Sequence, residues 1–166
     1  MDNLKIYAAS RTRHAPMWRR LRSEGWPIIS TWIDEAESGQ TADRAELATR
    51  CIREASEAHI TVVYGEQGEQ LKGALIEMGA AMANGHPVVL VGECLSPTSV
   101  FLEHPEIWPC VSIEAAAIAI NLIVAGSPAA HLPCRDLPRT AANCHKRTGW
   151  TDDRENPGNR RETPSP

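Results

Sequence analysis

Short apolar runs alternate with longer amphipathic stretches over the first 126 residues. Short, continuous apolar runs are typical of buried strands, whereas apolar residues at i, i+3, i+4 and i+7 are typical of helices. The pattern predicts strands at 4–9, 27–32, 59–64, 87–91 and 108–111. It predicts helices at 16–25, 41–58, 71–84 and 112–126. Thr41 and Ser112 are the expected N-caps of the second and last helices, because their hydroxyls can accept hydrogen bonds from free backbone N–H groups.

Strands that alternate with helices predict a parallel sheet, and continuous apolar strands predict that both of its faces are covered. We therefore expect an α/β fold. It would be a three-layer sandwich with a flavodoxin-like or Rossmann-like parallel sheet of about five strands and helices on both faces. In such sheets ligands bind beyond the carboxyl ends of the strands. Three loops at that edge are expected to carry the chemistry, at 10–16, 32–41 and 65–73.

The last 40 residues have a different composition. Residues 127–166 hold half of the 12 prolines, show no apolar periodicity, and carry 7 Lys or Arg against 5 Asp or Glu. Residues 1–126 carry 10 and 16. We predict one domain over 1–126, followed by a Pro/Arg-rich, largely irregular tail over 127–166.

Composition and charge exclude several classes of protein. A net charge of −4 and a pI near 5.9 argue against nucleic-acid binding led by overall charge. The longest apolar stretch, 115–126, is shorter than the roughly 20 residues that cross a membrane. The start of the chain has no secretion signal, and the five cysteines are odd in number, which together predict reduced thiols in the cytoplasm.

Four possible zinc ligands lie in the tail: His131, Cys134, Cys144 and His145. Their spacing fits no standard zinc site. Neither a metal nor another cofactor is predicted.

The loop after the first strand is rich in groups that bind anions. Ser10, Arg11, Thr12 and Arg13 precede the N-terminus of a helix. Hydroxyl, guanidinium and free backbone N–H groups at such a place suit a phosphate. The alternative is a solvated basic face, and the residues alone leave both open.

Glu77 has unusual neighbours on its helix. At offsets of three and four it shares a face with Gly73, Ala74, Ala80 and Ala81. A carboxylate among such small side chains has space beside it for a ligand. The alternative is that the small residues only let the helix pack closely while Glu77 points to water.

Four segments resemble, in the same order, the nucleoside 2-deoxyribosyltransferase-like family. They are KIYAAS, WPIISTWIDEA, KGALIEMGAAMANGHPVVLVGE and VFLEHPEIWPCVSIEAA, and the match spans residues 4–125. Its most specific part is a Glu-x-Gly-x-Ala helix followed by a Gly-x-Pro-Val strand. The family contains enzymes that exchange the bases of deoxynucleosides and nucleotide N-glycosidases that hydrolyse the same bond. The resemblance also implies a homodimer or larger homo-oligomer.

The resemblance implies two catalytic residues. Glu77 stands where the family keeps its nucleophile, which attacks the anomeric carbon of the sugar and forms a glycosyl-enzyme ester. Tyr7, in the first strand, falls near a tyrosine that orients this nucleophile.

The resemblance also implies substrate-binding residues. Ser10 and Arg11 lie where nucleotide-hydrolysing relatives bind the 5′-phosphate. Trp32 and Asp34 lie in the loop near the base, where an aromatic face can stack. The alternative for Trp32 is that it only closes the core. Gly73 leaves room beside the nucleophile.

One departure from the family concerns proton donation. Cys51 stands where the family usually has an Asp that assists the leaving base, and a neutral thiol is a poor replacement. Cys51 also lies on an apolar stripe, where a small buried residue is expected. Glu66, Glu69 or Asp34 could supply the acid instead.

Three hypotheses follow. The first is cleavage or transfer at the N-glycosidic bond of a (deoxy)nucleoside or its monophosphate, a small-molecule substrate, through a covalent glycosyl-enzyme on Glu77. The second, favoured by the missing acid at Cys51, is a catalytically impaired nucleotide- or nucleoside-binding module on the same scaffold. The third is an unrelated flavodoxin-like domain that binds other proteins.

Overall fold

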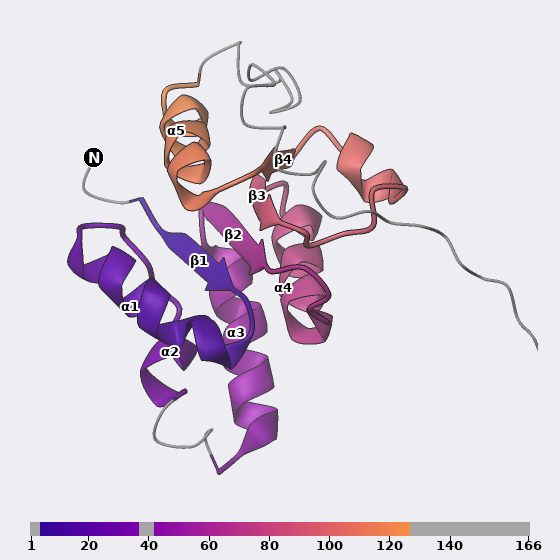
Figure 1. Cartoon of the computed structure of the whole chain (residues 1–166). Coiled ribbons are helices and arrows are strands. Elements are labelled where there is room, and N and C mark those ends of the chain that lie inside the picture. Colours follow the sequence, from indigo (N-terminus) through magenta and orange to yellow (C-terminus); the bar gives the residue numbers. More distant parts are fainter. Residues whose placement is uncertain (1–3, 37–41, 127–166) are drawn as a thin grey trace, which may run out of the picture. The chain divides into compact units, whose positions relative to one another are not determined.

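The computed structural model describes residues 4–36 and 42–126. Its centre is a parallel sheet of four strands, in the order β1 (Ile6–Ala9), β2 (Ile60–Gly65), β3 (Val88–Gly92) and β4 (Ile107–Cys110) (Figure 1). Nearly every residue of these strands is buried. The predicted parallel sheet is confirmed, with four strands among the described residues rather than about five.

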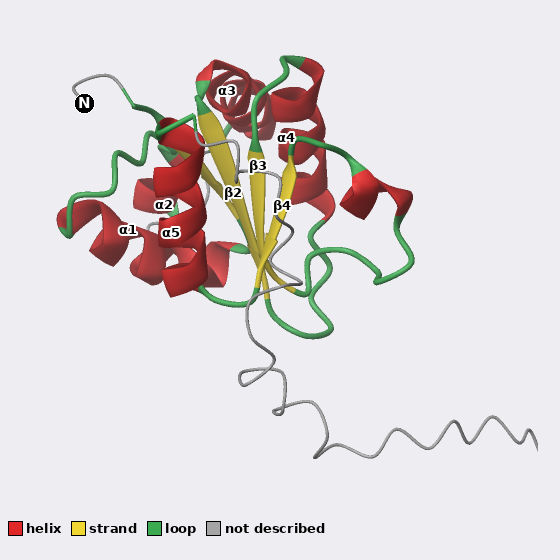
Figure 2. Ribbon diagram, turned by 90° about the horizontal axis from the view of Figure 1, so that it is seen from above, coloured by secondary structure: helices red, strands yellow, loops and turns green. Residues whose placement is uncertain are grey.

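Helices cover both faces of the sheet and complete three layers. They are α1 (Ala15–Ser23), α2 (Trp32–Glu35), α3 (Arg44–Glu57), α4 (Lys72–Ala83) and α5 (Ile113–Val124). Two 3₁₀ turns, η1 (Thr12–His14) and η2 (Val100–Glu103), precede α1 and β4. Helices α1 and α5 lie on one face, and α3 and α4 pack together on the other (Figure 2).

The predicted strand at 27–32 is wrong. The segment makes one parallel bridge, between Ile28 and Ile6, and then enters α2. The backbone N–H of Ala8 donates to Ser30 Oγ over 2.6 Å, and this hydroxyl donates to the Ala8 carbonyl over 3.2 Å. The Ser30 side chain therefore replaces the next backbone–backbone hydrogen bond, and the pairing of this segment with β1 ends there.

The single bridge at Ile28 lies on the edge of β1 opposite β2. When this segment is counted with the strands, the order along the sheet follows the flavodoxin-like pattern 2-1-3-4-5. The chain then reverses its direction of winding between β1 and β2. Sheets of this kind bind ligands at that switch point, beyond the carboxyl ends of the two strands.

The N-caps explain where two helices begin. Ser112 caps α5 as predicted, accepting a hydrogen bond from Ala115 N over 3.2 Å. The predicted cap at Thr41, which lies outside the described residues, is wrong, because Asp43 caps α3. Asp43 Oδ1 accepts hydrogen bonds from Ala45 N and Glu46 N over 2.9 and 3.0 Å. This cap fixes the first turn of α3 at the carboxyl edge of the sheet.

The predicted tail at 127–166 and its four possible zinc ligands lie outside the described residues. Among the residues that the structure describes, no helix has the length and apolar character needed to cross a membrane.

Candidate active site

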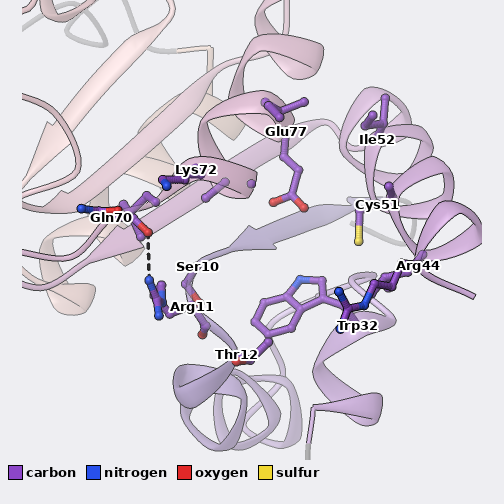
Figure 3. A pocket seen from close by; sticks show the side chains of 16 residues that line it. Ser10, Arg11, Thr12, Trp32, Arg44, Cys51, Ile52, Gln70, Lys72 and Glu77 are labelled. Atoms are coloured by element: carbon purple, nitrogen blue, oxygen red, sulfur yellow. Dashed lines mark hydrogen bonds between the residues drawn. The ribbon is translucent and has the colours of Figure 1, made fainter. Parts of the chain in front are cut away.

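A cavity of about 350 Å³ lies at the switch point between β1 and β2. Its walls come from the loop after β1, the start of α2, one face of α3, and the first turns of α4 with the loop before them (Figure 3). Five of the predicted site residues line it: Ser10, Arg11, Trp32, Gly73 and Glu77. The structure thus gathers residues that are far apart in the sequence around one hollow.

Glu77 is half-buried on α4, and its carboxylate points into the cavity (Figure 3). Burial raises the pKa of this group to about 7, and the negative charge of Glu54 acts in the same direction. Tyr7 and Cys51 lower the pKa by weaker interactions, and no described Lys or Arg contributes. The carboxylate therefore faces a cavity, and no cation in the described part of the chain neutralises it.

Tyr7 lies next to Glu77 and is fully buried in β1. Burial, followed by the negative charge of Glu77, raises the pKa of Tyr7 far above its usual value of 10, so the hydroxyl stays protonated. No described group forms a hydrogen bond of normal geometry with this hydroxyl. An unpaired buried hydroxyl costs about 1–3 kcal/mol, so its position calls for an explanation.

Cys51 lines the cavity from α3, close enough to Tyr7 and Glu77 to perturb both. Burial raises the pKa of its thiol to about 11, although the interaction with Tyr7 lowers it. The thiol is therefore neutral at pH 7. Cys51 is a small buried residue of the helix stripe, as expected, and also part of the cavity wall.

Three cationic side chains line the cavity: Arg11, Arg44 and Lys72. None of them has a carboxylate partner among the described residues, whereas several other arginines are paired with carboxylates. Arg11 Nη1 donates to the backbone carbonyl of Gln70, over 3.2 Å. Unpaired cations around a cavity favour an anionic ligand.

The sequence analysis named Thr12 as a possible phosphate-binding residue, but it missed three polar residues of the wall: Arg44, Gln70 and Lys72. Arg44 and Lys72 are the first residues of α3 and α4. A basic residue that opens a helix at the carboxyl edge of a parallel sheet is the signal that could have found these two.

Trp32 and Ser10 line the cavity and also hold the structure together. Trp32 is 8% exposed, and its indole N–H donates to the Ala8 carbonyl over 2.8 Å. Both roles considered for Trp32, in the core and at the ligand, are therefore compatible with its position. Ser10 Oγ accepts a hydrogen bond from Trp18 Nε1 over 2.8 Å and donates to the Arg11 carbonyl over 3.2 Å.

Asp34 does not line the cavity. Its carboxylate is paired with Arg22, whose Nη1 lies 3.0 Å from Asp34 Oδ2. The hydrogen bonds from Arg22 lower the pKa of Asp34. The structure therefore separates Asp34 from the other predicted site residues.

The other two candidate acids, Glu66 and Glu69, are also paired outside the cavity wall. Arg13 Nη2 lies 2.6 Å from Glu66 Oε2, and Arg13 Nε lies 2.8 Å from Glu69 Oε1. His14 Nε2 lies 3.0 Å from Glu69 Oε2. Glu77 is thus the one carboxylate that lines the cavity among the described residues.

Among residues 4–36 and 42–126, no three His, Cys, Asp or Glu side chains are grouped so that they could hold a metal ion.

No protein-family model and no curated relative matches this chain. Among solved structures, the CMP N-glycosidase BcmB of Clostridium botulinum is similar in fold, with 12% sequence identity and a TM-score of 0.44. The match covers 71% of this chain and 98% of that one. A likeness of this strength says nothing about the substrate of this chain.

Proposed function

We propose that this protein cleaves the N-glycosidic bond of a (deoxy)nucleoside 5′-monophosphate, with Glu77 as the nucleophile. The observation that carries the proposal is the Glu77 carboxylate, which faces the cavity without a neutralising cation among the described residues. Strongly perturbed pKa values in a cleft are typical of functional groups. Because no cation among the described residues binds the Glu77 carboxylate, its oxygen is available to attack the sugar carbon.

The reaction has two steps on this carboxylate. A Glu77 oxygen bonds to C1′ of the sugar while the bond between C1′ and the base nitrogen breaks, and the electron pair of that bond leaves with the base. Water, or a second base, then attacks C1′ and releases Glu77. The first case is hydrolysis and the second is base transfer.

Tyr7 has a positioning role in this mechanism. Its hydroxyl is protonated at every physiological pH and lies beside Glu77, so it can donate a hydrogen bond to one carboxylate oxygen. That bond would hold the other oxygen toward the sugar. The role explains why a buried hydroxyl without a normal hydrogen bond is kept at this place.

The cations favour a phosphorylated substrate. Arg11 and Lys72 line the cavity on the side of the loop after β1, near Ser10 and Thr12 (Figure 3). Guanidinium, ammonium and hydroxyl groups bind phosphate oxygens with charge-assisted hydrogen bonds. Because the domain carries more acidic than basic residues, cations that have no carboxylate partner among the described residues are informative at this place.

A second candidate function is nucleotide binding without turnover. Cys51 favours it, because a thiol with a pKa of about 11 is a weak proton donor at pH 7. In that case the cavity would bind the same nucleotides, and no base would be released.

The test is release of free base from a panel of deoxynucleosides, ribonucleosides and their 5′-monophosphates, followed by chromatography. Glu77→Gln should lower the rate at least about 10³-fold, because it removes the nucleophile and keeps the shape. Glu57→Gln, at an exposed site on α3, is the matched control and should leave the rate unchanged. Added second base would convert product to a new nucleotide only in a transferase.

Mass spectrometry of the intact protein and of its proteolytic peptides adds an independent measurement. A sugar adduct on the peptide that contains Glu77 would support the covalent step. Tight nucleotide binding without base release would favour the binding module instead. Neither binding nor release across the panel would contradict both candidates.

A further inference from the structure

The leaving base lacks a carboxylic acid in the described part of this site. Asp34, Glu66 and Glu69 are each paired with an arginine and none of them lines the cavity. Hydrogen bonding to Arg22 lowers the pKa of Asp34, which makes it a still poorer proton donor at pH 7. The charge that develops on the base must therefore be met by another kind of group.

Arg44 is placed to meet that charge. With Leu47, Ala48 and Cys51 it follows the i, i+3, i+4, i+7 spacing on α3, and all four residues line the cavity. Cys51, next to Glu77, and Arg44 thus lie on the same helix face. Trp32, at the start of α2, lines the same cavity.

The cavity has cations on two sides. Arg11 and Lys72 lie on one side, and Arg44, on α3, lies on the other (Figure 3). Trp32 lines the same cavity. A nucleoside monophosphate has one phosphate, which Arg11 and Lys72 can bind. Arg44 and Trp32 then face the base, offering hydrogen-bond donors to its edge and an apolar surface to its ring.

We propose that Arg44 binds a carbonyl oxygen of the base and stabilises the negative charge on that base as it leaves, in place of a general acid. This inference rests on the proposed function. When the bond between C1′ and nitrogen breaks, its electron pair moves to the base, and resonance spreads the charge onto the carbonyl oxygen. Arg44 N–H groups donate to that oxygen, and the departed base takes a proton from water. The substrate class is a nucleotide with a keto base, such as uracil.

The first experiment separates a base contact from a phosphate contact. We would measure kcat/KM for deoxyuridine monophosphate and for deoxyuridine with the wild type, Arg44→Gln and Arg11→Gln. Arg44→Gln should lower kcat/KM about 10- to 100-fold for both substrates. Arg11→Gln should lower it mainly for the monophosphate. Arg53→Gln, on the same helix but outside the cavity wall, is the matched control and should change neither.

The second experiment varies the leaving group. The 5-fluoro analogue of deoxyuridine monophosphate releases a base that carries negative charge more easily. The loss caused by Arg44→Gln should be several-fold smaller with this analogue than with the parent. Arg44→Lys should recover part of the activity, because it keeps the charge but not the planar fork.

The outcomes distinguish this inference from the function on which it rests. If no substrate releases its base, the proposed function fails and the role of Arg44 fails with it. Suppose instead that release occurs and depends on Glu77. An Arg44→Gln loss that vanishes with deoxyuridine, equals that of Arg53→Gln, or is identical for the fluorinated analogue would then overturn the role of Arg44 alone. Cleavage confined to adenine nucleotides, whose base has no carbonyl group, would do the same.

Discussion

Two glutamates near the same edge of the sheet have opposite surroundings. Glu69, with 7% of its side chain exposed, is bonded to Arg13, His14 and the backbone N–H of Glu66. Burial alone would raise the pKa of Glu69, but these partners outweigh it and the pKa is lowered. Glu77 has no cationic partner among the described residues, and its pKa rises to about 7.

The two glutamates differ in role: the ion pairs of Glu69 stabilise the loops, whereas Glu77 is left available for a ligand in the cavity. The loop cluster of Arg13, His14, Glu66 and Glu69 ties the loop after β1 to the loop after β2. The ring of Tyr64 packs edge-on against His14, with centroids 4.8 Å apart. A buried carboxylate without a cation costs stability, and proteins keep such groups mainly where function needs them.

The largest expected effect is on the pH dependence of activity, because Glu77 has no neutralising partner in the described part of the chain. Glu77 must be ionised to attack the sugar, and its pKa is about 7. We therefore expect kcat/KM to rise up to tenfold per pH unit below 7, about 50-fold from pH 5 to 7, and to reach a plateau above that. Steady-state rates between pH 5 and 9 would test this, with circular dichroism as a control for folding at each pH. A flat or falling profile would contradict the role of Glu77 as nucleophile.

Glu69→Gln should destabilise the fold by about 2–3 kcal/mol at pH 7, because buried His14 loses its carboxylate partner and Arg13 loses one of its two. Urea unfolding would measure this, and Glu57→Gln at an exposed site should cost less than about 0.5 kcal/mol. The pKa of Glu69 is lower in the folded state, so its stabilisation is present above the unfolded pKa of 4.5. The difference from the wild type should therefore fade as the pH drops below that value. A cost that is the same at pH 4 and pH 7 would show that packing, not charge, explains it.

Glu77→Gln should have the opposite sign and stabilise the fold by about 1–3 kcal/mol at pH 8. The pKa of Glu77 is about 7 in the folded chain against 4.5 unfolded. Ionisation therefore favours the unfolded state increasingly as the pH rises from 4.5 to 7, and fully above 7. The variant lacks this penalty, so thermal unfolding should show a gain at pH 8 that is nearly absent at pH 4.5. A loss of stability at pH 8 would mean that the carboxylate has a partner after all.

The layered fold was predictable because it depends on local patterns, whereas the residues around Glu77 left open whether its carboxylate faces a ligand or water. Strand and helix periods lie within short windows, and the small neighbours of Glu77 lie within one turn of its helix. The end of the 27–32 segment was not predictable. It depends on a hydrogen bond between Ser30 and the backbone of Ala8, which only the tertiary structure brings together.

That Arg44 and Lys72 line one cavity could not be predicted, for a similar reason. Arg44 and Lys72 begin different helices, and nothing in the sequence between them indicates that they face one hollow. Conversely, Asp34 stands next to Trp32 in the loop that the resemblance assigned to the base. Its partner is Arg22 on α1, and this pairing turns Asp34 away from the role the sequence suggested.

Asp34→Asn should give the smallest effect, and it tests whether a carboxylate paired with an arginine is dispensable for catalysis. Its carboxylate is half exposed and paired with Arg22, so the loss should be below about 1 kcal/mol in urea unfolding. The kcat/KM for any cleaved nucleotide should stay within twofold of the wild type, because Asp34 does not line the cavity. A drop of tenfold or more, concentrated in kcat, would mean that Asp34 leaves Arg22 to protonate the base in the bound complex. Pairing with a cation would then no longer separate structural carboxylates from catalytic ones in this molecule.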